Sequence, residues 1–235
     1  MADNTMTIAP DAHALQEAPA APGAPAVREA ATAVHDVLVH RRSPAQHLAD
    51  EMTAGSGEQV GLRELPFLTQ IGLRAVPGTD AGDALEAALG APLPRRVGEV
   101  TGIPDGTGEV AVLWLSPDEF LLVAPDEAVS GVATTEYAGR LAGALGARPG
   151  QVVDVSANRT TLELSGPRAR TVLEKSCRID LHPREFPVGR AVVTVLGTTP
   201  VILWHTGEVT WRVMPRASFA THTVRWLLDG MREFV

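Results

Sequence analysis

Runs of apolar residues, and stretches in which apolar and polar residues alternate, mark out the elements of the chain. Thr69, Ile71 and Leu73 alternate with polar or small residues, which is typical of a half-buried strand. Two apolar runs flank the turn-forming residues 116–119, and this arrangement predicts a β-hairpin. In order, the pattern predicts a strand over 65–76, a helix over 80–89, strands over 110–115 and 120–124, a helix over 137–145 and a strand over 152–155. Asp80 is the expected N-cap of the first of these helices.

A second series of elements follows after a short polar turn. Leu162 and Leu164 fall on one face of an extended segment, and Thr161 and Glu163 fall on the other, as in a half-buried strand. In order, the pattern predicts a strand over 160–165, a helix over 168–177, strands over 190–196, 201–205 and 209–213, and a helix over 218–230. Ser218 is the expected N-cap of the last helix.

The order of the elements predicts the fold class. From 68 to 155 it is strand, helix, strand, strand, helix, strand, which is the split β-α-β arrangement of ferredoxin-like domains. The later elements echo this order. We therefore predict an α+β fold of two fused ferredoxin-like halves, at about 62–157 and 158–235. Because only the turn 156–159 joins them, the halves are expected to form one unit over 42–235.

Two segments depart from this regular pattern. Residues 1–41 form an N-terminal extension that begins with an Ala/Pro-rich stretch, and residues 1–25 are predicted to be disordered because they carry too little apolar surface to bury. Apolar residues at helical spacing then predict a short amphipathic helix over 26–40. This helix fits an arm on the domain's own surface and a docking segment for a partner equally well. The Pro/Gly-rich segment 92–108 is predicted to be a long loop and a candidate contact site.

Composition and charge exclude several classes of protein. The chain has 235 residues, of which 45% are hydrophobic, as in an ordinary soluble protein. The formal net charge of −8 argues against a nucleic-acid-binding protein, because phosphate backbones are bound by clustered Lys and Arg. No apolar stretch is long enough to span a membrane, and the N-terminus does not resemble a signal peptide. A cytoplasmic location is therefore expected.

Several side chains are chemically suited to catalysis, but each also has a structural explanation. Asp118 and Glu119 lie together at a predicted hairpin tip, where solvated turn residues are expected. Asp180 and His182 could form a base and its orienting group, although no nucleophile is near them in sequence, and a polar loop after a helix is the simpler interpretation. The other candidates are the single cysteine, Cys177, and the lone histidines His205 and His222. We interpret the two histidines as packed residues, because they lie alone on apolar elements. We interpret Cys177 as a small buried apolar residue, because it ends a predicted helix, where a reactive thiolate is not favoured.

The densest polar group lies at the turn between the two halves and contains Asp154, Ser156, Asn158 and Arg159. A buried contact between Asp154 and Arg159 would be structural, and the alternative is a contact with a partner subunit. Trp226 in the last helix fits either the core or a partner surface, since aromatic residues are enriched at both.

Several of these motifs resemble a known family. The strand-turn-helix segment Leu162–Pro167, with the pattern Leu-x-Leu-Ser-Gly-Pro, resembles the folate-binding superfamily of the glycine-cleavage aminomethyltransferase. Four further motifs resemble the gamma-subunit family of heterotetrameric sarcosine oxidases: Ser43-Pro44, Trp114–Leu121, Asp154–Thr160 and Arg216–Ala220. The resemblance covers roughly residues 42–234.

The resemblance implies a function for the complex and a supporting role for this chain. Such complexes demethylate sarcosine oxidatively to glycine with FAD, FMN and NAD, and tetrahydrofolate accepts the one-carbon unit. The resemblance implies that these groups sit on other subunits, and that this chain has no catalytic, cofactor-binding or metal-binding residues. It also implies that the main contact is with the alpha subunit, and that beta and delta subunits complete the heterotetramer.

An enzymatic alternative also follows from the superfamily. The chain could bind folate and transfer a one-carbon unit by itself, as aminomethyltransferases do. Those enzymes have an additional domain for which this chain has no sequence, and an aromatic platform for a pterin is hard to build when aromatics are only 4% of the residues. A third hypothesis is a free-standing binding module of the same fold.

Overall fold

The computed structural model describes residues 40–104 and 109–235. The predicted disorder of residues 1–25 lies outside this range, as does all of the predicted helix over 26–40 except its last residue. By their contacts, residues 42–235 cluster as one unit.

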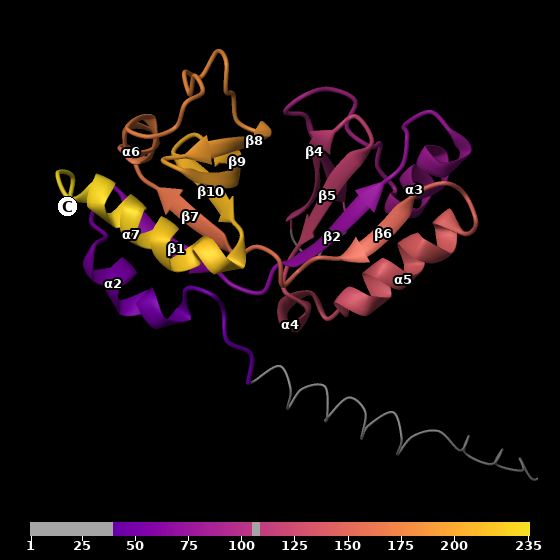
Figure 1. The fold of residues 1–235 in the computed structure, drawn as a ribbon, viewed down its shortest axis with the longest axis horizontal. Coiled ribbons are helices and arrows are strands. Elements are labelled where there is room, and N and C mark those ends of the chain that lie inside the picture. The colour runs from indigo at the N-terminus through magenta and orange to yellow at the C-terminus, as the bar shows by residue number, and fades with distance from the viewer. Residues whose placement is uncertain (1–39, 105–108) are drawn as a thin grey trace, which may run out of the picture. The chain divides into compact units, whose positions relative to one another are not determined.

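Helices and strands succeed one another along this unit (Figure 1). The helical segments, with η for 3₁₀ helices, are η1 (Gln46–Leu48), α2 (Ala49–Ala54), α3 (Asp80–Leu89), α4 (Glu127–Ser130), α5 (Thr134–Leu145), α6 (Ala169–Glu174), η2 (Ala217–Phe219) and α7 (Ala220–Met231). The strands are β1 (Gly61–Leu65), β2 (Thr69–Arg74), β3 (Val100–Pro104), β4 (Glu109–Ser116), β5 (Glu119–Ala124), β6 (Gln151–Asp154), β7 (Thr161–Ser165), β8 (Ala191–Leu196), β9 (Thr199–Gly207) and β10 (Thr210–Pro215). Sheet A has the order β1-β7-β10-β9-β8, and sheet B has the order β3-β4-β5-β2-β6.

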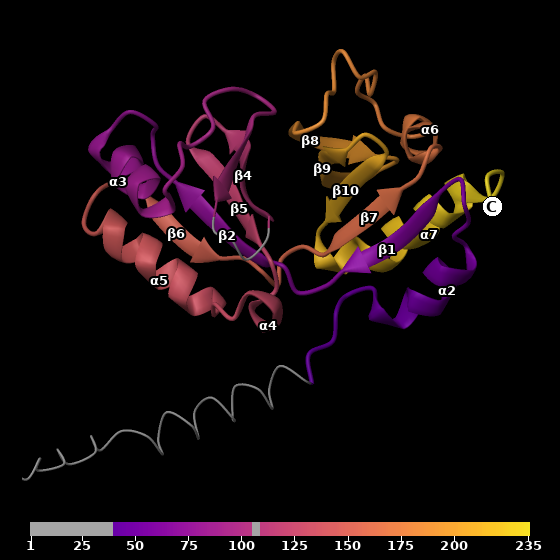
Figure 2. The ribbon, with the colours of Figure 1, turned by 180° about the vertical axis from the view of Figure 1, so that it is seen from behind.

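Sheet B confirms the ferredoxin-like prediction for the first half. Its neighbouring strands are all antiparallel, and β2, α3, β4, β5, α5 and β6 follow one another as in a split β-α-β unit. Helices α3 and α5 lie on the same side of the sheet in both views (Figures 1 and 2). The predicted loop over 92–108 is wrong for residues 100–104, which form the edge strand β3. Gly102 and Pro104 make this strand hard to recognise, because both residues are depleted in strands.

Sheet A repeats the same plan with one strand taken from elsewhere in the chain. Strand β7, α6, β9, β10 and α7 follow the ferredoxin-like order, and β8 is an additional edge strand that corresponds to β3. The fourth strand is β1, which precedes sheet B in sequence and pairs with β7. The register places Arg63 opposite Glu163, and the Arg63 Nε donates a hydrogen bond of 2.7 Å to the Glu163 Oε1. The two halves therefore echo each other, as predicted, although β1 crosses between them.

The predicted strand over 65–76 is wrong at its beginning. Strand β1 ends at Leu65, and β2 begins at Thr69 in the other sheet. Between them, Pro66 lacks the N–H that a sheet would use, and Phe67 has a φ of 59°, in the left-handed region. These residues interrupt the extended backbone and allow the chain to pass from sheet A to sheet B.

Three apolar clusters hold the unit together. One lies between sheet A and helices α2, α6 and α7, and the second lies between sheet B and helices α3 and α5. The third joins residues of the two sheets, among them Leu113 and Leu121 from sheet B and Ile202 and Trp204 from sheet A. Strand β7 is buried on both faces, and the predicted exposure of one face is wrong, because Thr161 and Glu163 are only 1% and 9% exposed.

Two helix caps differ from their predictions. The Thr79 hydroxyl, rather than Asp80, accepts a hydrogen bond from the Gly82 N–H at the start of α3. Asp80 lies in the first turn, where its charge is favourable near the positive end of the helix dipole. Ser218 is exposed within η2 and makes no cap, because a 3₁₀ turn precedes α7.

Candidate functional site

A groove of about 540 Å³ lies beside the turn that joins the two halves. Residues of β2, β5 and β6 that face away from α3 and α5 contribute Gly72, Leu121 and Val153 to its lining. Ile202 from β9 and the arginines Arg159 and Arg216 line it from the sheet A side. A pocket of this size is in the range that holds a small molecule or the side chains of a partner protein.

The polar turn beside the groove is held by its own hydrogen bonds. The Asp154 carboxylate accepts bonds from the Ser156 N–H at 2.9 Å and the Ser156 hydroxyl at 2.7 Å. The Gln70 N–H donates to the Ser156 Oγ at 2.9 Å, which attaches the turn to β2. A contact between Asp154 and Arg159 is absent from the part of the chain that the structure describes, so the predicted structural pair is wrong. The reason is local, since the Ser156 backbone and side chain occupy the carboxylate.

Arg159 and Arg216 instead lie beside each other. Their backbones form an isolated antiparallel bridge, and the Ala217 N–H donates to the Asn158 carbonyl at 2.9 Å. The Arg159 guanidinium donates to the Met214 carbonyl at 3.0 Å, and the Gln70 amide donates to the Arg159 carbonyl at 2.9 Å. Burial, together with the like charge of Arg216, lowers the pKa of Arg159 below its ordinary value.

The paired acids at the hairpin tip form a surface ion pair. The Arg74 Nε donates to the Asp118 Oδ2 at 3.0 Å, and an Arg74 guanidinium nitrogen lies 3.8 Å from Glu119. The hydrogen bond from Arg74 lowers the pKa of Asp118 below its usual range. A carboxyl whose pKa is lowered is a poor general acid at neutral pH. Both acids lie at the surface, as the interpretation as solvated turn residues predicts, but they are paired with Arg74, and Glu119 is the first residue of β5 rather than part of the turn.

Asp180 and His182 do not form a catalytic pair. The Asp180 Oδ1 accepts a hydrogen bond of 2.8 Å from the His182 backbone N–H, and the His182 ring accepts from the Arg184 N–H at 3.3 Å. These bonds shape the loop after α6, as the simpler interpretation predicts. Cys177 follows α6 and packs against the cluster under sheet A, but it is only partly buried, so the prediction of a buried residue holds for its packing and not for its full burial.

The two histidines differ from each other. His205 is buried, and its Nδ1 lies 2.9 Å from the Phe186 carbonyl. Its ring stacks on Trp211 with centroids 3.8 Å apart, which confirms the packed interpretation. His222 is exposed on α7, near Trp226, so the same interpretation is wrong for it.

Trp226 lies partly on the surface of the protein. It is 43% exposed, and its indole N–H donates to the Ser176 hydroxyl at 2.9 Å. The ring lies close above Gly197, at which a Cβ atom would be 3.0 Å from the indole. One edge of this side chain is therefore fixed to the protein, and the remainder is available to solvent or a partner.

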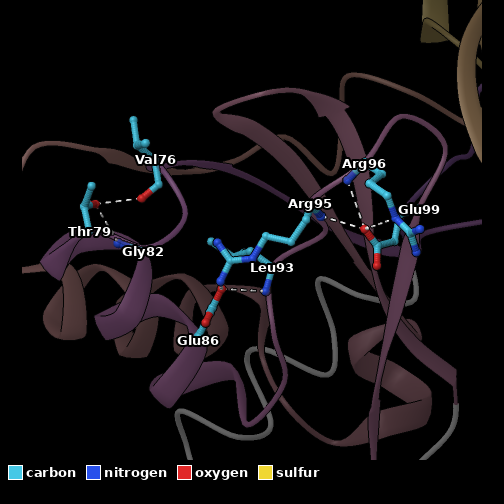
Figure 3. A network of polar contacts seen from close by, with 8 residues as sticks. All are labelled: Val76, Thr79, Gly82, Glu86, Leu93, Arg95, Arg96 and Glu99. Atoms are coloured by element: carbon cyan, nitrogen blue, oxygen red, sulfur yellow. Dashed lines mark hydrogen bonds and ion pairs between the residues drawn. The ribbon is translucent and has the colours of Figure 1, made fainter.

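The first part of the predicted contact loop is held down by two carboxylates (Figure 3). Glu86 of α3 accepts hydrogen bonds from the Arg95 guanidinium at 2.7 Å and the Leu93 N–H at 3.0 Å. Glu99 accepts from the Arg95 and Arg96 N–H groups at 2.7 and 3.0 Å. These contacts order residues 93–99 and direct the chain into β3.

Glu64 is a polar centre that sequence reasoning missed. Its carboxylate accepts hydrogen bonds from the Ser43 hydroxyl, the Ala45 N–H and the Thr160 hydroxyl. Ser43 is part of a sequence motif, but Glu64 lies 21 residues further along the chain. The pairing of β1 with β7 places Glu64 where it meets these donors, and the sequence pattern gives no sign of this pairing. The contact joins the segment before η1 to the start of the second half.

The described residues contain neither a candidate metal cluster nor a membrane-spanning helix. Within 40–104 and 109–235, no cluster of three or more His, Cys, Asp and Glu side chains is arranged to hold a metal ion. None of the helices described is both long and apolar enough to cross a membrane.

Comparison with known proteins gives closely similar relatives. Residues 76–233 match the family described as sarcosine oxidase, gamma subunit family. The chain is 57% identical over 195 residues to a sarcosine oxidase subunit gamma from Arthrobacter sp., covering 83% of this chain and 91% of that protein. It is 55% identical over 195 residues, with the same coverage, to the subunit gamma of Corynebacterium sp. strain P-1.

Two solved structures are similar to this chain, one in sequence and fold and the other in fold alone. A chain of the heterotetrameric sarcosine oxidase from Corynebacterium sp. U-96, in complex with pyrrole 2-carboxylate, matches with a TM-score of 0.75 and 56% identity, over 83% of this chain and 96% of that one. The glycine cleavage system aminomethyltransferase T from Bartonella henselae matches with a TM-score of 0.55 and 19% identity, over 76% of this chain and 48% of that one. The second match shows a shared fold, which confirms the predicted fold class.

Proposed function

Because this chain belongs to the sarcosine oxidase gamma subunit family, we propose that it is the gamma subunit of a heterotetrameric sarcosine oxidase. The observation that carries the proposal is the extent of the similarity, which reaches 56% identity over 96% of a chain from such a heterotetramer. An identity this high over nearly a whole subunit is expected to preserve both the fold and the surfaces that meet the other subunits.

Within the complex, we propose a supporting role without a catalytic centre in this chain. The proposal is supported by what the candidate side chains do. Asp118 is held by Arg74, Asp180 shapes a loop, and His205 is packed on an aromatic ring. None of these groups is left in position to act as a nucleophile or as a general base toward a substrate.

The reaction and its cofactors are proposed for the complex as a whole. Sarcosine would be demethylated to glycine, with FAD, FMN and NAD on the other subunits and tetrahydrofolate as the acceptor of the one-carbon unit. We propose the alpha subunit as the main contact of this chain, beta and delta subunits as the remaining members, and the cytoplasm as the location.

The second candidate is a protein that binds folate and transfers a one-carbon unit by itself. The groove of about 540 Å³ favours it, because a cavity of this size could hold a small molecule. The likeness to the aminomethyltransferase shows the fold alone, and it covers 48% of that enzyme. Titration of tetrahydrofolate into the isolated chain distinguishes the two candidates. Tight, saturable binding would argue for the second.

The proposed function is tested by co-expression of the tagged chain with the alpha, beta and delta subunits of a sarcosine oxidase from the same organism. The chain is expected to retain the other three subunits through affinity purification, together with the flavin absorbance of the complex. Purification of the chain by itself, with no flavoprotein attached, would refute the proposed function.

A further inference from the structure

Two arginine side chains lie at the end of the groove nearest sheet A. Arg159 and Arg216 both line the groove, and their backbones are paired in a β-bridge. No carboxylate among residues 40–104 and 109–235 forms an ion pair with either guanidinium. Like charges held close together in a partly buried site destabilise each other unless an anion compensates them.

The remaining arginine of the groove provides an internal comparison. Arg74 also lines the groove, but its guanidinium is bound by Asp118 and approached by Glu119. The chain as a whole carries a formal charge of −8, so acids are abundant on it. Glu119 also lines the groove but lies on the side of Arg74, so among the described residues the absence of an ion pair at Arg159 and Arg216 is a local property of their end of the groove.

The Arg159 side chain and the backbone that carries both arginines are held in position before any ligand arrives. The Arg159 carbonyl is bound by the Gln70 amide, its guanidinium by the Met214 carbonyl, and the neighbouring Asn158 carbonyl by the Ala217 N–H. A preorganised site loses less entropy when it binds its ligand. Arg159 and Arg216 both line the groove, and the planar N–H donors of a guanidinium match the geometry of a carboxylate.

The adjoining surface is apolar and accessible to a protein chain. Val153 is 39% exposed on the edge strand β6, and Val155 and Leu121 lie near it in the lining. Gly72 has no side chain and leaves room over the middle of the sheet, where a Cβ atom would meet only ordinary contacts at 3.8 Å. Arg216 is exposed, so a partner can reach it without a rearrangement of this chain.

We propose that this groove receives an acidic segment of a partner subunit, with an Asp or Glu carboxylate bound between Arg159 and Arg216 and apolar atoms resting on Val153. The inference depends on the proposed function, since it requires that the chain works as a subunit. It goes further by naming the surface and the chemistry that the partner presents. Arginine in a partly desolvated pocket is a frequent source of binding energy at protein interfaces.

The test measures binding of the tagged, full-length chain to the subcomplex of the other three subunits. Arg216→Glu is the main variant, because this side chain is exposed and its replacement puts a negative charge where the partner's carboxylate would lie. We expect the dissociation constant to rise by about 30-fold or more, as is typical when a desolvated charge pair is broken at an interface. Higher salt should weaken the wild-type complex more than the complex of the variant.

Matched controls separate this site from a general effect of charge. Arg178→Glu and Arg184→Glu make the same change of charge at exposed arginines outside the groove lining, and both are expected to bind within about 3-fold of wild type. Thermal unfolding of each isolated variant checks that the fold is kept. A photo-crosslinking residue introduced at Val153 is expected to attach to an acidic segment of a partner subunit.

The possible outcomes lead to different conclusions. If Arg216→Glu binds like the controls, the groove is not the contact and the inference is wrong. If wild type itself fails to bind the subcomplex, the proposed function is refuted instead. If the variant assembles normally while tetrahydrofolate or succinate raises the melting temperature of wild type only, the groove is a small-molecule site and the inference is overturned.

Discussion

Replacement of Glu64 by alanine should destabilise the protein far more than its half-buried position suggests. The Glu64 carboxylate accepts hydrogen bonds from Ser43, Ala45 and Thr160, and the last two residues are buried. The variant leaves a buried N–H and a buried hydroxyl without an acceptor, and each such group costs about 1–3 kcal/mol. Ser43 is half-buried and can bond to water, so its loss is small. We expect a decrease of about 3 kcal/mol in the free energy of unfolding.

The measurement is thermal or urea unfolding of the isolated chain, followed by circular dichroism. A loss of about 3 kcal/mol corresponds to a fall of about 6–12 °C in melting temperature for a unit of this size. Glu58→Ala, at an exposed position just before β1, is the matched control and should change stability by less than about 0.5 kcal/mol. Glu64→Gln keeps an acceptor and should lie between the two. If Glu64→Ala behaved like Glu58→Ala, the role assigned to this carboxylate would be wrong.

Two further predictions concern the backbone and the surface charges. Gly166→Ala should destabilise the protein by about 1–3 kcal/mol, because φ is +115° at this position and the new Cβ would lie 2.6 Å from a carbonyl oxygen. Its control is Gly139→Ala on the open surface of α5, which should stabilise the protein by about 0.5–1 kcal/mol. If the two variants changed the free energy of unfolding in urea equally, the role assigned to the backbone of Gly166 would be wrong. The Asp118 carboxyl should titrate by NMR below its usual range and return toward it in Arg74→Gln. The stability that the ionised Asp118 carboxylate gives to the folded protein should be complete above its unfolded pKa of about 3.9. This contribution should disappear as the pH falls through the lower folded pKa. An acid-unfolding profile unchanged by Asp118→Asn would contradict the pairing.

Elements formed by neighbours in sequence could be predicted, and those completed by distant segments could not. The hairpin of β4 and β5 is apparent from two apolar runs and the turn between them, because both strands and their connection are local. Strand β1 pairs with β7 about 100 residues later, and its pattern runs on toward that of β2. Pro66 and the left-handed Phe67 divide the two strands; the proline is the sequence signal of this break, whereas the positive φ of Phe67 has none.

The candidate site shows the same division. The turn from Asp154 to Arg159 was recognised as the densest polar group, and its position between the halves was predicted. The hydrogen bonds of the Asp154 carboxylate could not be predicted, because the nearby Ser156 N–H and hydroxyl compete with Arg159 for it. Arg216 lies 57 positions beyond Arg159 and comes beside it only after β10 has joined sheet A.

The fold also explains why chemically suited residues are used for structure. A unit made of two sheets and their covering helices has many strand ends and turns, and each needs polar groups to satisfy its backbone. Asp180, Glu86 and Glu99 each accept backbone N–H bonds at such positions. Acids of this kind resemble catalytic residues in a sequence, although their hydrogen-bonding capacity is already used by the chain itself.

Native mass spectrometry of the tagged chain, co-expressed with the three other subunits and purified under mild conditions, tests the central claim most directly. If the chain is a gamma subunit, the spectrum will show one particle that contains one copy of it together with one copy of each of three different chains. A spectrum with only the isolated chain, or with copies of it alone, would contradict the account.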